Sequence, residues 1–355
     1  MAPSAGRFRW GILGTGAIAG QFATELGRAE GAELHAVASR EEGRARSFAA
    51  AHGASIAHGS YEALLADSAV DIVYVATPAE RHHDHCLAAL DAGKPVLCEK
   101  PFGLSAREAA AMAGIARARN LFCMEAMWMR FSPLVRRARE LVRSGRLGTI
   151  GFLRAEAGYR AGEARLRDAG PGHGALLNFG VYGASLVHFL CGPPTRVQAE
   201  MTWHASGLDE SFCATLRYPG HIATISAGIG AAMTNEAVVV GSAGRLRLGA
   251  PFFHPGYLQY VREDMREGGS PARASRLAER LPGLGLLQGS FVASWLRGRG
   301  QIVARPRGAH GLRLEAEEAM RCLTEGETES PIVPLAETVA VMETLDAIRA
   351  AAGSA

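Results

Sequence analysis

Short apolar runs alternate with helix-period segments over the first third of the chain. Strands are expected at residues 8–13, 32–39, 70–76 and 94–99. Helices are expected at 17–28, 44–52, 82–92 and 105–119, with another beginning at 61. The run at 70–76 is β-branched and nearly free of polar residues, as is typical of a strand buried on both faces. Strand alternating with helix predicts a doubly wound parallel sheet.

The pattern changes after about residue 124. Strand-like segments then dominate, at 149–157, 197–204, 212–218, 221–228, 237–241 and 245–248. Several adjoin glycine or Pro-Gly turns, which favour antiparallel neighbours. Helices are expected at 131–144, 171–190, 312–324 and 335–351.

We therefore expect two domains, because 355 residues exceed the usual size of one hydrophobic core. Residues 1–124 would form the parallel α/β domain, and 125–355 an α+β domain with an open, mainly antiparallel sheet. The last helix, 335–351, could pack back on the first domain.

The segment at about 262–305 does not follow this pattern. It is rich in Arg, Gly, Pro and Ser, with an apolar stretch at 281–296. A long atypical insertion is usually a lid, an interface or a disordered region. Binding of 284–295 to a membrane surface is one interpretation, but a packed helix or a subunit contact is the preferred one.

Composition narrows the class of protein. The chain is 48% hydrophobic and 21% charged, as in globular proteins, and no apolar run approaches the roughly 20 residues of a membrane span. Its first residues lack the apolar core of a signal peptide. Six scattered cysteines suit free thiols in a reducing compartment, which predicts a cytoplasmic protein. A net charge of +3 supports neither nucleic-acid binding nor a membrane anchor.

Lysine is rare in this chain. Only Lys94 and Lys100 are lysines among its 38 basic residues. Arginine replaces lysine on a surface, but it cannot serve where a titratable amine is needed. Either lysine could have survived by chance, but the pair marks candidate chemistry.

A glycine-rich turn follows the first strand, with the sequence Gly14-Thr15-Gly16-Ala17-Ile18-Ala19. Gly14 permits the tight turn and Gly16 the close approach of a pyrophosphate, while Ala19 permits close packing of helix on strand. The helix amino terminus supplies amides for the phosphates. Because the motif lies at the first strand–helix junction, it predicts a Rossmann dinucleotide site.

The end of the second strand indicates which dinucleotide binds. An acidic residue there would bind the ribose hydroxyls of NAD, but this chain has Ser39 and Arg40. A hydroxyl beside a guanidinium suits a 2′-phosphate. The alternative is an ordinary surface arginine. The sequence therefore favours NADP over NAD.

Several motifs together resemble the Gfo/Idh/MocA oxidoreductase family, nearest its dimeric dihydrodiol dehydrogenase and NADP-dependent xylose dehydrogenase branch. They span nearly the whole chain. The matching residues are Arg9 to Gly16, Ala76-Thr77-Pro78 with His82, Glu99-Lys100-Pro101, Glu125-Ala126-Met127-Trp128 with Arg130-Phe131, Gly180-Val181-Tyr182, and Glu315 to Arg349.

The resemblance implies a site in which Lys100 and Tyr182 face the nicotinamide and the substrate. When hydride leaves a carbinol carbon, the hydroxyl proton must pass to a base, and an ammonium beside Tyr182 would stabilise its phenolate. It also implies cofactor contacts at Thr77, Pro78, His82, Glu99, Trp128 and Arg130, besides the glycine turn, Ser39 and Arg40. Substrate contacts are expected at His173, Asn178 and Tyr182.

Asn178 departs from the family, which usually has aspartate at this position. Helical i, i+4 spacing places it on the face of Tyr182. Asparagine can hold a substrate hydroxyl but cannot accept a proton. Either Asn178 only positions the substrate, or the site is impaired or repurposed. The nearby run of His82, His83 and His85 is not expected to bind metal, because helical neighbours point in different directions.

The main hypothesis is hydride transfer between NADP(H) and a secondary alcohol or ketone of a sugar, sugar derivative or cyclic polyol. The substrate could be a free aldose or a glycosyl or nucleotide-linked sugar. One alternative is a catalytically weak NADP-binding redox sensor. Another is a cofactor-recycling oxidation–elimination enzyme acting on glycosides. We also expect a homo-oligomer, a dimer or tetramer, formed through the C-terminal sheet.

Overall fold

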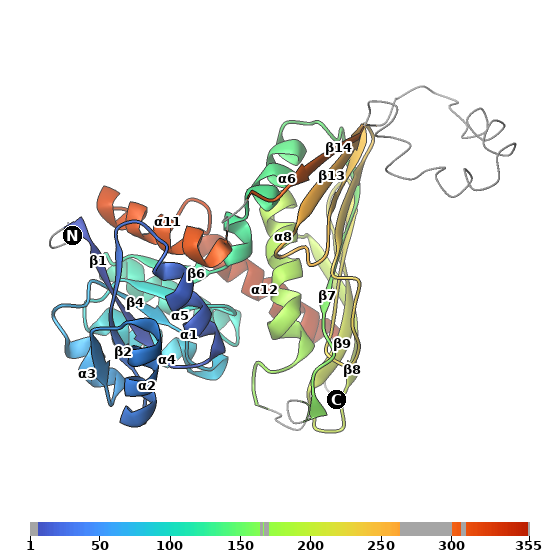
Figure 1. The fold of residues 1–355 in the computed structure, drawn as a ribbon. Helices are drawn as coiled ribbons and strands as arrows, with labels where there is room; N and C mark the ends of the chain where they lie inside the picture. The colour runs from blue at the N-terminus through green and yellow to red at the C-terminus, as the bar shows by residue number, and fades with distance from the viewer. Residues whose placement is uncertain (1–5, 164–165, 167–169, 263–299, 307–309, 354–355) are drawn as a thin grey trace, which may run out of the picture.

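The computed structural model describes residues 6–163, 166, 170–262, 300–306 and 310–353. Two sheets organise them, one near each end of the molecule, with long helices between (Figure 1). The parallel α/β unit and the mainly antiparallel second sheet expected from the sequence are both confirmed.

The first sheet has six parallel strands in the order β3-β2-β1-β4-β5-β6. Its strands are β1 (Phe8–Leu13), β2 (Ala32–Ala38), β3 (Ile56–His58), β4 (Ile72–Val75), β5 (Val96–Glu99) and β6 (Cys123–Ala126). Its helices are α1 (Ala17–Leu26), α2 (Glu42–His52), α3 (Tyr61–Ala66), the 3-10 turn η2 (Ala79–Arg81), α4 (His82–Asp91) and α5 (Ala106–Ala118). The order reverses beside β1, so the crevice at the carboxyl ends of β1 and β4 is the place where such sheets bind ligands.

The second sheet has eight strands in the order β14-β13-β12-β11-β7-β10-β9-β8, and all its pairs are antiparallel except β7 with β10. The strands are β7 (Ile150–Gly158), β8 (Arg196–Trp203), β9 (Asp209–Arg217), β10 (Ile222–Gly228), β11 (Ala237–Gly241), β12 (Gly244–Leu248), β13 (Tyr257–Arg262) and β14 (Gly300–Ala304).

Helices cover the face of this sheet that is turned toward the first sheet (Figure 1). These helices are α6 (Pro133–Arg143), the π-helical turn η4 (Leu176–Gly180), α8 (Val181–Cys191) and α12 (Leu335–Ala352). The 3-10 turn η3 (Trp128–Phe131) comes just before α6. The remaining helix, α11 (Gly311–Glu325), packs against η3 and α1.

The last helix joins the two halves. Asp346 on α12 accepts a hydrogen bond from the amide of Ala106 at the start of α5, at 2.8 Å. The Thr338 hydroxyl donates to Glu125 on β6 at 3.3 Å. Since β6 pairs with β5 as far as Ala126, a domain boundary at residue 124 would divide this strand.

Four strands were not expected from the sequence: β3, β6, β13 and β14. β3 and β6 are short, and Glu125 interrupts the apolar pattern of β6. β13 and β14 pair with each other where the sequence predicts the start and end of the atypical 262–305 segment. The expected apolar stretch at 281–296 lies outside the described residues.

All six cysteines are free thiols. Among the helices that the structure describes, none has both the length and the apolar character needed to cross a bilayer.

Candidate active site

A cavity of about 460 Å³ lies at the carboxyl ends of the first sheet. Residues of the second domain close it, so both halves of the chain contribute to its wall. Its lining consists of Ile18, Gln21, Thr77, Ala79, His82, Glu99, Lys100, Pro101, Trp128, Gly172, His173, Asn178 and Tyr182. Nine of the seventeen residues predicted for the site therefore line this one cavity.

The glycine turn fits a dinucleotide. Gly14 has φ +105°, and a Cβ there would lie 2.6 Å from the carbonyl oxygen of Ala76, so a side chain is excluded. Gly16 is the N-cap of α1 and offers no side chain to the amides of the first turn. A Cβ at Gly16 would meet nothing within 4 Å. Open space therefore faces unpaired amides, as phosphate binding requires.

The two residues after β2 differ in exposure. Ser39 is buried, and its hydroxyl accepts the amide of Glu41 at 3.4 Å. Arg40 is exposed and forms no ion pair with any residue that the structure describes. Its guanidinium is thus available to a phosphate at the edge of the crevice.

Lys100 follows β5 directly and points across to the second domain. Its amine donates to the backbone carbonyl of Asn178 at 3.1 Å and lies 4.7 Å from the ring centroid of Tyr182. The Lys100–Pro101 peptide bond is cis. The ammonium therefore lies over the tyrosine ring, a cation–π arrangement.

Tyr182 lies in the first turn of α8 and is 5% exposed. Its hydroxyl accepts the indole N–H of Trp128 at 3.1 Å, and its ring stacks on Phe253 with centroids 4.6 Å apart. Burial raises the pKa of Tyr182 well above its ordinary value, and the charge of Glu99 raises it further. The phenolate expected from the sequence is therefore disfavoured here, because burial penalises its negative charge.

Asn178 lies in a π-helical turn, not in a regular α-helix as its spacing suggested. Its side-chain amide donates to the carbonyl of His173 at 3.1 Å. Such turns often occur at functional sites. Asn178 and His173 line the same cavity as Tyr182. The three residues are thus close together, as expected, although a π-helical turn and not a regular α-helix carries Asn178.

Comparisons with known proteins agree with this architecture. A family model described as an oxidoreductase family with an NAD-binding Rossmann fold matches residues 8–127, and a GFO/IDH/MocA C-terminal domain model matches residues 135–247. The chain belongs to the Gfo/Idh/MocA oxidoreductase family. The resemblance drawn from the sequence motifs is thereby confirmed.

Relatives in this family match along nearly the whole chain. Trans-1,2-dihydrobenzene-1,2-diol dehydrogenases of Bos taurus and Homo sapiens are each 32% identical over 351 residues, covering 97% of both chains. The solved structure of KijD10, a 3-ketoreductase from Actinomadura kijaniata in complex with NADP and TDP-benzene, is 25% identical, with a TM-score of 0.79 and 97% coverage of each chain. Levoglucosan dehydrogenase shares the fold, with a TM-score of 0.80 at 19% identity over 98% of this chain and 97% of its own.

His82 and Arg130, both predicted to contact the cofactor, form hydrogen bonds that connect separate segments of the chain. The ring of His82 lies 2.7 Å from the carbonyl of Pro101 and 2.9 Å from that of Thr77, so it connects two turns of the crevice wall. Burial lowers its pKa, and a neutral imidazole donates only one of these bonds.

Arg130 does not line the cavity. It is buried, donating to Ser185 at 2.8 Å and pairing with Glu337 at 3.1 Å. The sequence motif that contains Arg130 could not show which way its side chain points. The structure gives Arg130 contacts that connect η3, α8 and α12, and its cofactor contact stays a prediction.

Two further buried carboxyl groups, those of Glu125 and Glu315, lie beside Glu99 of the cavity lining, and no pattern in the sequence predicted that the three would meet. Glu99 accepts the amide of Lys100 at 3.0 Å and the hydroxyl of Tyr74. Glu315 on α11 is wholly buried, and neither of its oxygens has a hydrogen-bond partner among the described residues. Burial raises the pKa of Glu315 well above its ordinary value, with Glu99 and Glu125 adding to the effect.

Trp128, which lines the cavity, is surrounded by residues outside the lining that sequence reasoning missed. Phe253, His254 and His310 come from segments far apart in the chain, and each contacts the indole ring of Trp128. No motif joins them, so only the fold could reveal them. Gln21 and Gly172 also line the cavity. Within the described ranges, no three His, Cys, Asp or Glu side chains are grouped in a way that could hold a metal ion.

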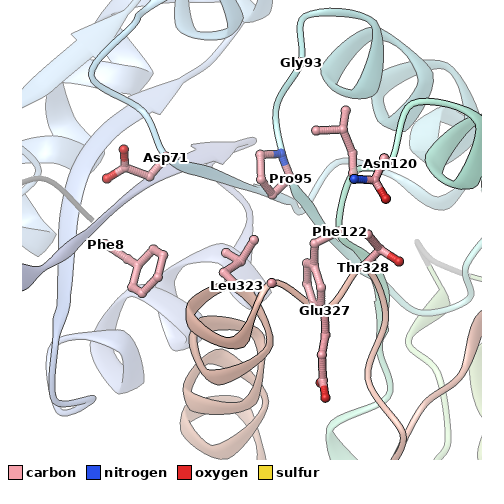
Figure 2. A pocket seen from close by; sticks show the side chains of 11 residues that line it. Phe8, Asp71, Gly93, Pro95, Asn120, Phe122, Leu323, Glu327 and Thr328 are labelled. Atoms are coloured by element: carbon pink, nitrogen blue, oxygen red, sulfur yellow. The ribbon is translucent and has the colours of Figure 1, made fainter. Parts of the chain in front are cut away.

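A second cavity, of about 280 Å³, lies at the amino ends of the strands of the first sheet, opposite the catalytic cavity. Figure 2 shows Phe8, Pro95 and Leu323 at its border. Phe8 begins β1, while Asp71 and Pro95 come just before β4 and β5. Asp71 is already paired with Arg9 at 3.0 Å. This amino end is not where open α/β sheets bind their ligands.

Proposed function

We propose that the protein transfers a hydride between NADP(H) and a secondary alcohol or ketone of a sugar, sugar derivative or cyclic polyol. One observation carries the proposal: Lys100 and Tyr182 come from different domains but line one cavity beside the glycine turn, with the Lys100 amine 4.7 Å from the centroid of the Tyr182 ring.

The residues present fit NADP. The open amides after Gly16 suit the pyrophosphate, and the exposed Arg40 with Ser39 suits the 2′-phosphate. The 3-ketoreductase relative was solved with NADP, which supports the same choice. When bound, NADP(H) supplies or accepts the hydride.

The protein's own residues handle the proton. In reduction, the Tyr182 hydroxyl gives its proton to the carbonyl oxygen as that oxygen becomes an alcohol. Trp128 keeps the phenolic oxygen in place through its N–H donor. The nearby ammonium of Lys100 then stabilises the tyrosinate that remains until solvent restores its proton. Oxidation of the alcohol follows the same path backwards.

The polar edge of the cavity supports a hydroxylated substrate. Asn178 and His173 stand on one side, and an amide side chain can hold a substrate hydroxyl. Relatives named as a dihydrodiol dehydrogenase and a 3-ketoreductase act on vicinal hydroxyls or a ketone by their names. These facts favour hydride transfer over the redox-sensor and oxidation–elimination alternatives.

Association and location complete the proposal. Three apolar side chains stand in one row on the open face of the second sheet: Phe152 opposite Ile222 and Val240, each 39–43% exposed. We propose that this face joins two copies of the chain, since exposed apolar patches commonly mark interfaces. The six free thiols support a cytoplasmic location.

The test is a panel of aldoses, cyclic polyols, trans-dihydrodiols and nucleotide-linked keto sugars, followed by NADPH absorbance in both directions. We expect turnover with at least one class. Tyr182→Phe should lower kcat by about 10²–10⁴-fold, as loss of a positioned acid does. Tyr218→Phe is the matched control, because that tyrosine is also buried and loses one hydrogen bond, to Gly192.

A Tyr182→Phe protein that folds and keeps full kcat would refute the proton role. Failure of NADP(H) and NAD(H) to bind would refute the proposed function altogether.

A further inference from the structure

A row of arginines lies on one face of α6, away from the catalytic cavity. Arg136, Arg139 and Arg143 are spaced i, i+3, i+7, so their side chains share a helix face. They border a groove of about 470 Å³, whose floor includes Phe189 of α8 and Ile332. None of the residues that line this arginine groove lines the catalytic cavity.

Arg139 is held in a fixed orientation. The central carbon of its guanidinium lies 4.0 Å from the ring centroid of Phe189, and that of Arg130 lies 5.1 Å from the same ring. Such cation–π contacts order a guanidinium without neutralising it. The Nε atom of Arg139 is buried and has no hydrogen-bond partner among the described residues. A buried donor of this kind requires an acceptor.

The carboxylates nearest the groove are already paired. Glu140 bonds Arg137 at 2.9 Å, and Glu337 bonds Arg130 at 3.1 Å. No carboxylate in the described part of the chain forms an ion pair with Arg136, Arg139 or Arg143. The pKa of Arg139 is lowered by burial and then by the charge of Arg143. The charge of Glu337 raises this pKa, but among the described residues no carboxylate is paired with any of the three arginines, and these cations repel one another.

We propose that the arginine groove binds the diphosphate group of a small molecule. A planar guanidinium group can donate two parallel N–H hydrogen bonds to two oxygens of one phosphate. Three guanidinium charges, reduced by the one carboxylate of Glu140 in the wall, match an anion of two or three negative charges. The groove's volume lies within the range of small-molecule sites, about 300–1,000 Å³.

The test measures calorimetric binding of inorganic pyrophosphate to the full chain at low ionic strength, where charge attraction is least screened. NADP is present at saturation, so that the glycine turn cannot take up the titrant. We expect one pyrophosphate per chain. Arg139→Gln should weaken pyrophosphate binding at least tenfold. Arg139→Lys should also weaken it, because lysine keeps the positive charge but lacks the planar guanidinium.

Arg107→Gln is the matched control, since Arg107 is an exposed arginine on α5, outside the groove, and its loss changes the net charge equally. Its affinity should equal that of the wild type. A second titration uses ADP. Tighter binding of ADP than of pyrophosphate would identify the ligand as a nucleoside diphosphate, and equal or weaker binding would identify it as a free diphosphate.

Absence of binding, or an equal loss in Arg107→Gln and Arg139→Gln, would overturn the proposal. If Arg139→Gln does not fold, Arg136→Gln and Arg143→Gln provide the same comparison on exposed side chains. Unchanged affinity in both would likewise overturn it.

Discussion

Replacement of Glu125 by glutamine should remove a pH-dependent cost from the folded protein. Glu125 is buried on β6, and its Oε1 has no hydrogen-bond partner among the described residues. Burial raises its pKa from 4.5 to about 7. Since the folded state holds this proton more tightly than the unfolded chain, the group stabilises the protein fully below about pH 4.5. That stabilisation is lost as the pH rises through about 7.

The size of the effect follows from the shift. A change from 4.5 to about 7 is equivalent to about 3 kcal/mol of unfolding free energy between acid and alkaline pH. Glutamine has nearly the same shape, can still accept the Thr338 hydroxyl bond and never ionises. The stability of the variant should therefore exceed that of the wild type by less than about 1 kcal/mol at pH 5 and by about 3 kcal/mol at pH 8.

The assay is thermal unfolding at pH 5 and pH 8. At pH 8 the Glu125→Gln melting temperature should exceed that of the wild type by roughly 3 to 6 °C, allowing about 1–2 °C per kcal/mol for a chain of this length. Glu343→Gln, on an exposed position of α12, should show no such difference. Equal wild-type and Glu125→Gln melting temperatures at both pH values would show that Glu125 ionises inside the fold without penalty.

Three further predictions concern the cofactor, the substrate and the interface. Arg40→Ala should weaken NADP binding by roughly tenfold to a hundredfold, the usual loss for a charge-assisted bond, while NAD binding stays unchanged. Arg44→Ala, one turn further on, should alter neither, and a parallel loss of NAD affinity would contradict a 2′-phosphate contact. Asn178→Asp should keep the fold and move the pH profile of kcat to higher pH, because a new negative charge beside Lys100 and Tyr182 raises both pKa values; an unchanged profile would show that this position does not tune the chemistry. Phe152→Glu should convert an oligomer to a monomer in light scattering, whereas Arg196→Glu, at an exposed position of the edge strand β8, should not; persistence of the oligomer would place the interface elsewhere.

Local sequence explains much of the first domain. Ser105 is the N-cap of α5, and its hydroxyl accepts the amide of Glu108, three residues further on, at 3.3 Å. Gly14 was expected at a tight turn, and its φ of +105° excludes other residues. A helix cap and a tight turn depend on residues only a few positions apart, so both can be predicted from a short stretch of sequence.

Associations over long distances were less accessible. The short strands β3 and β6 have little periodicity of their own, and the partner of β13 lies beyond a long insertion. The π-helical turn around Asn178 likewise has no signature in the sequence. Asp209, far along the chain, accepts the amide of Leu176 within that turn, and this long-range contact could not be read from spacing.

By itself, the sequence determined the parallel α/β unit, the glycine turn, the Ser39–Arg40 pair and the candidate status of Lys100 and Tyr182. Periodicity and the chemistry of single residues decide those features. Only the tertiary structure decided that the Lys100 amine lies over the Tyr182 ring, that Arg130 faces inward, and that Glu315 is buried beside Glu99 and Glu125. Orientation, burial and charge at these positions depend on segments that meet only when the two domains pack together, and local patterns of residues do not show which side chains those segments bring into contact.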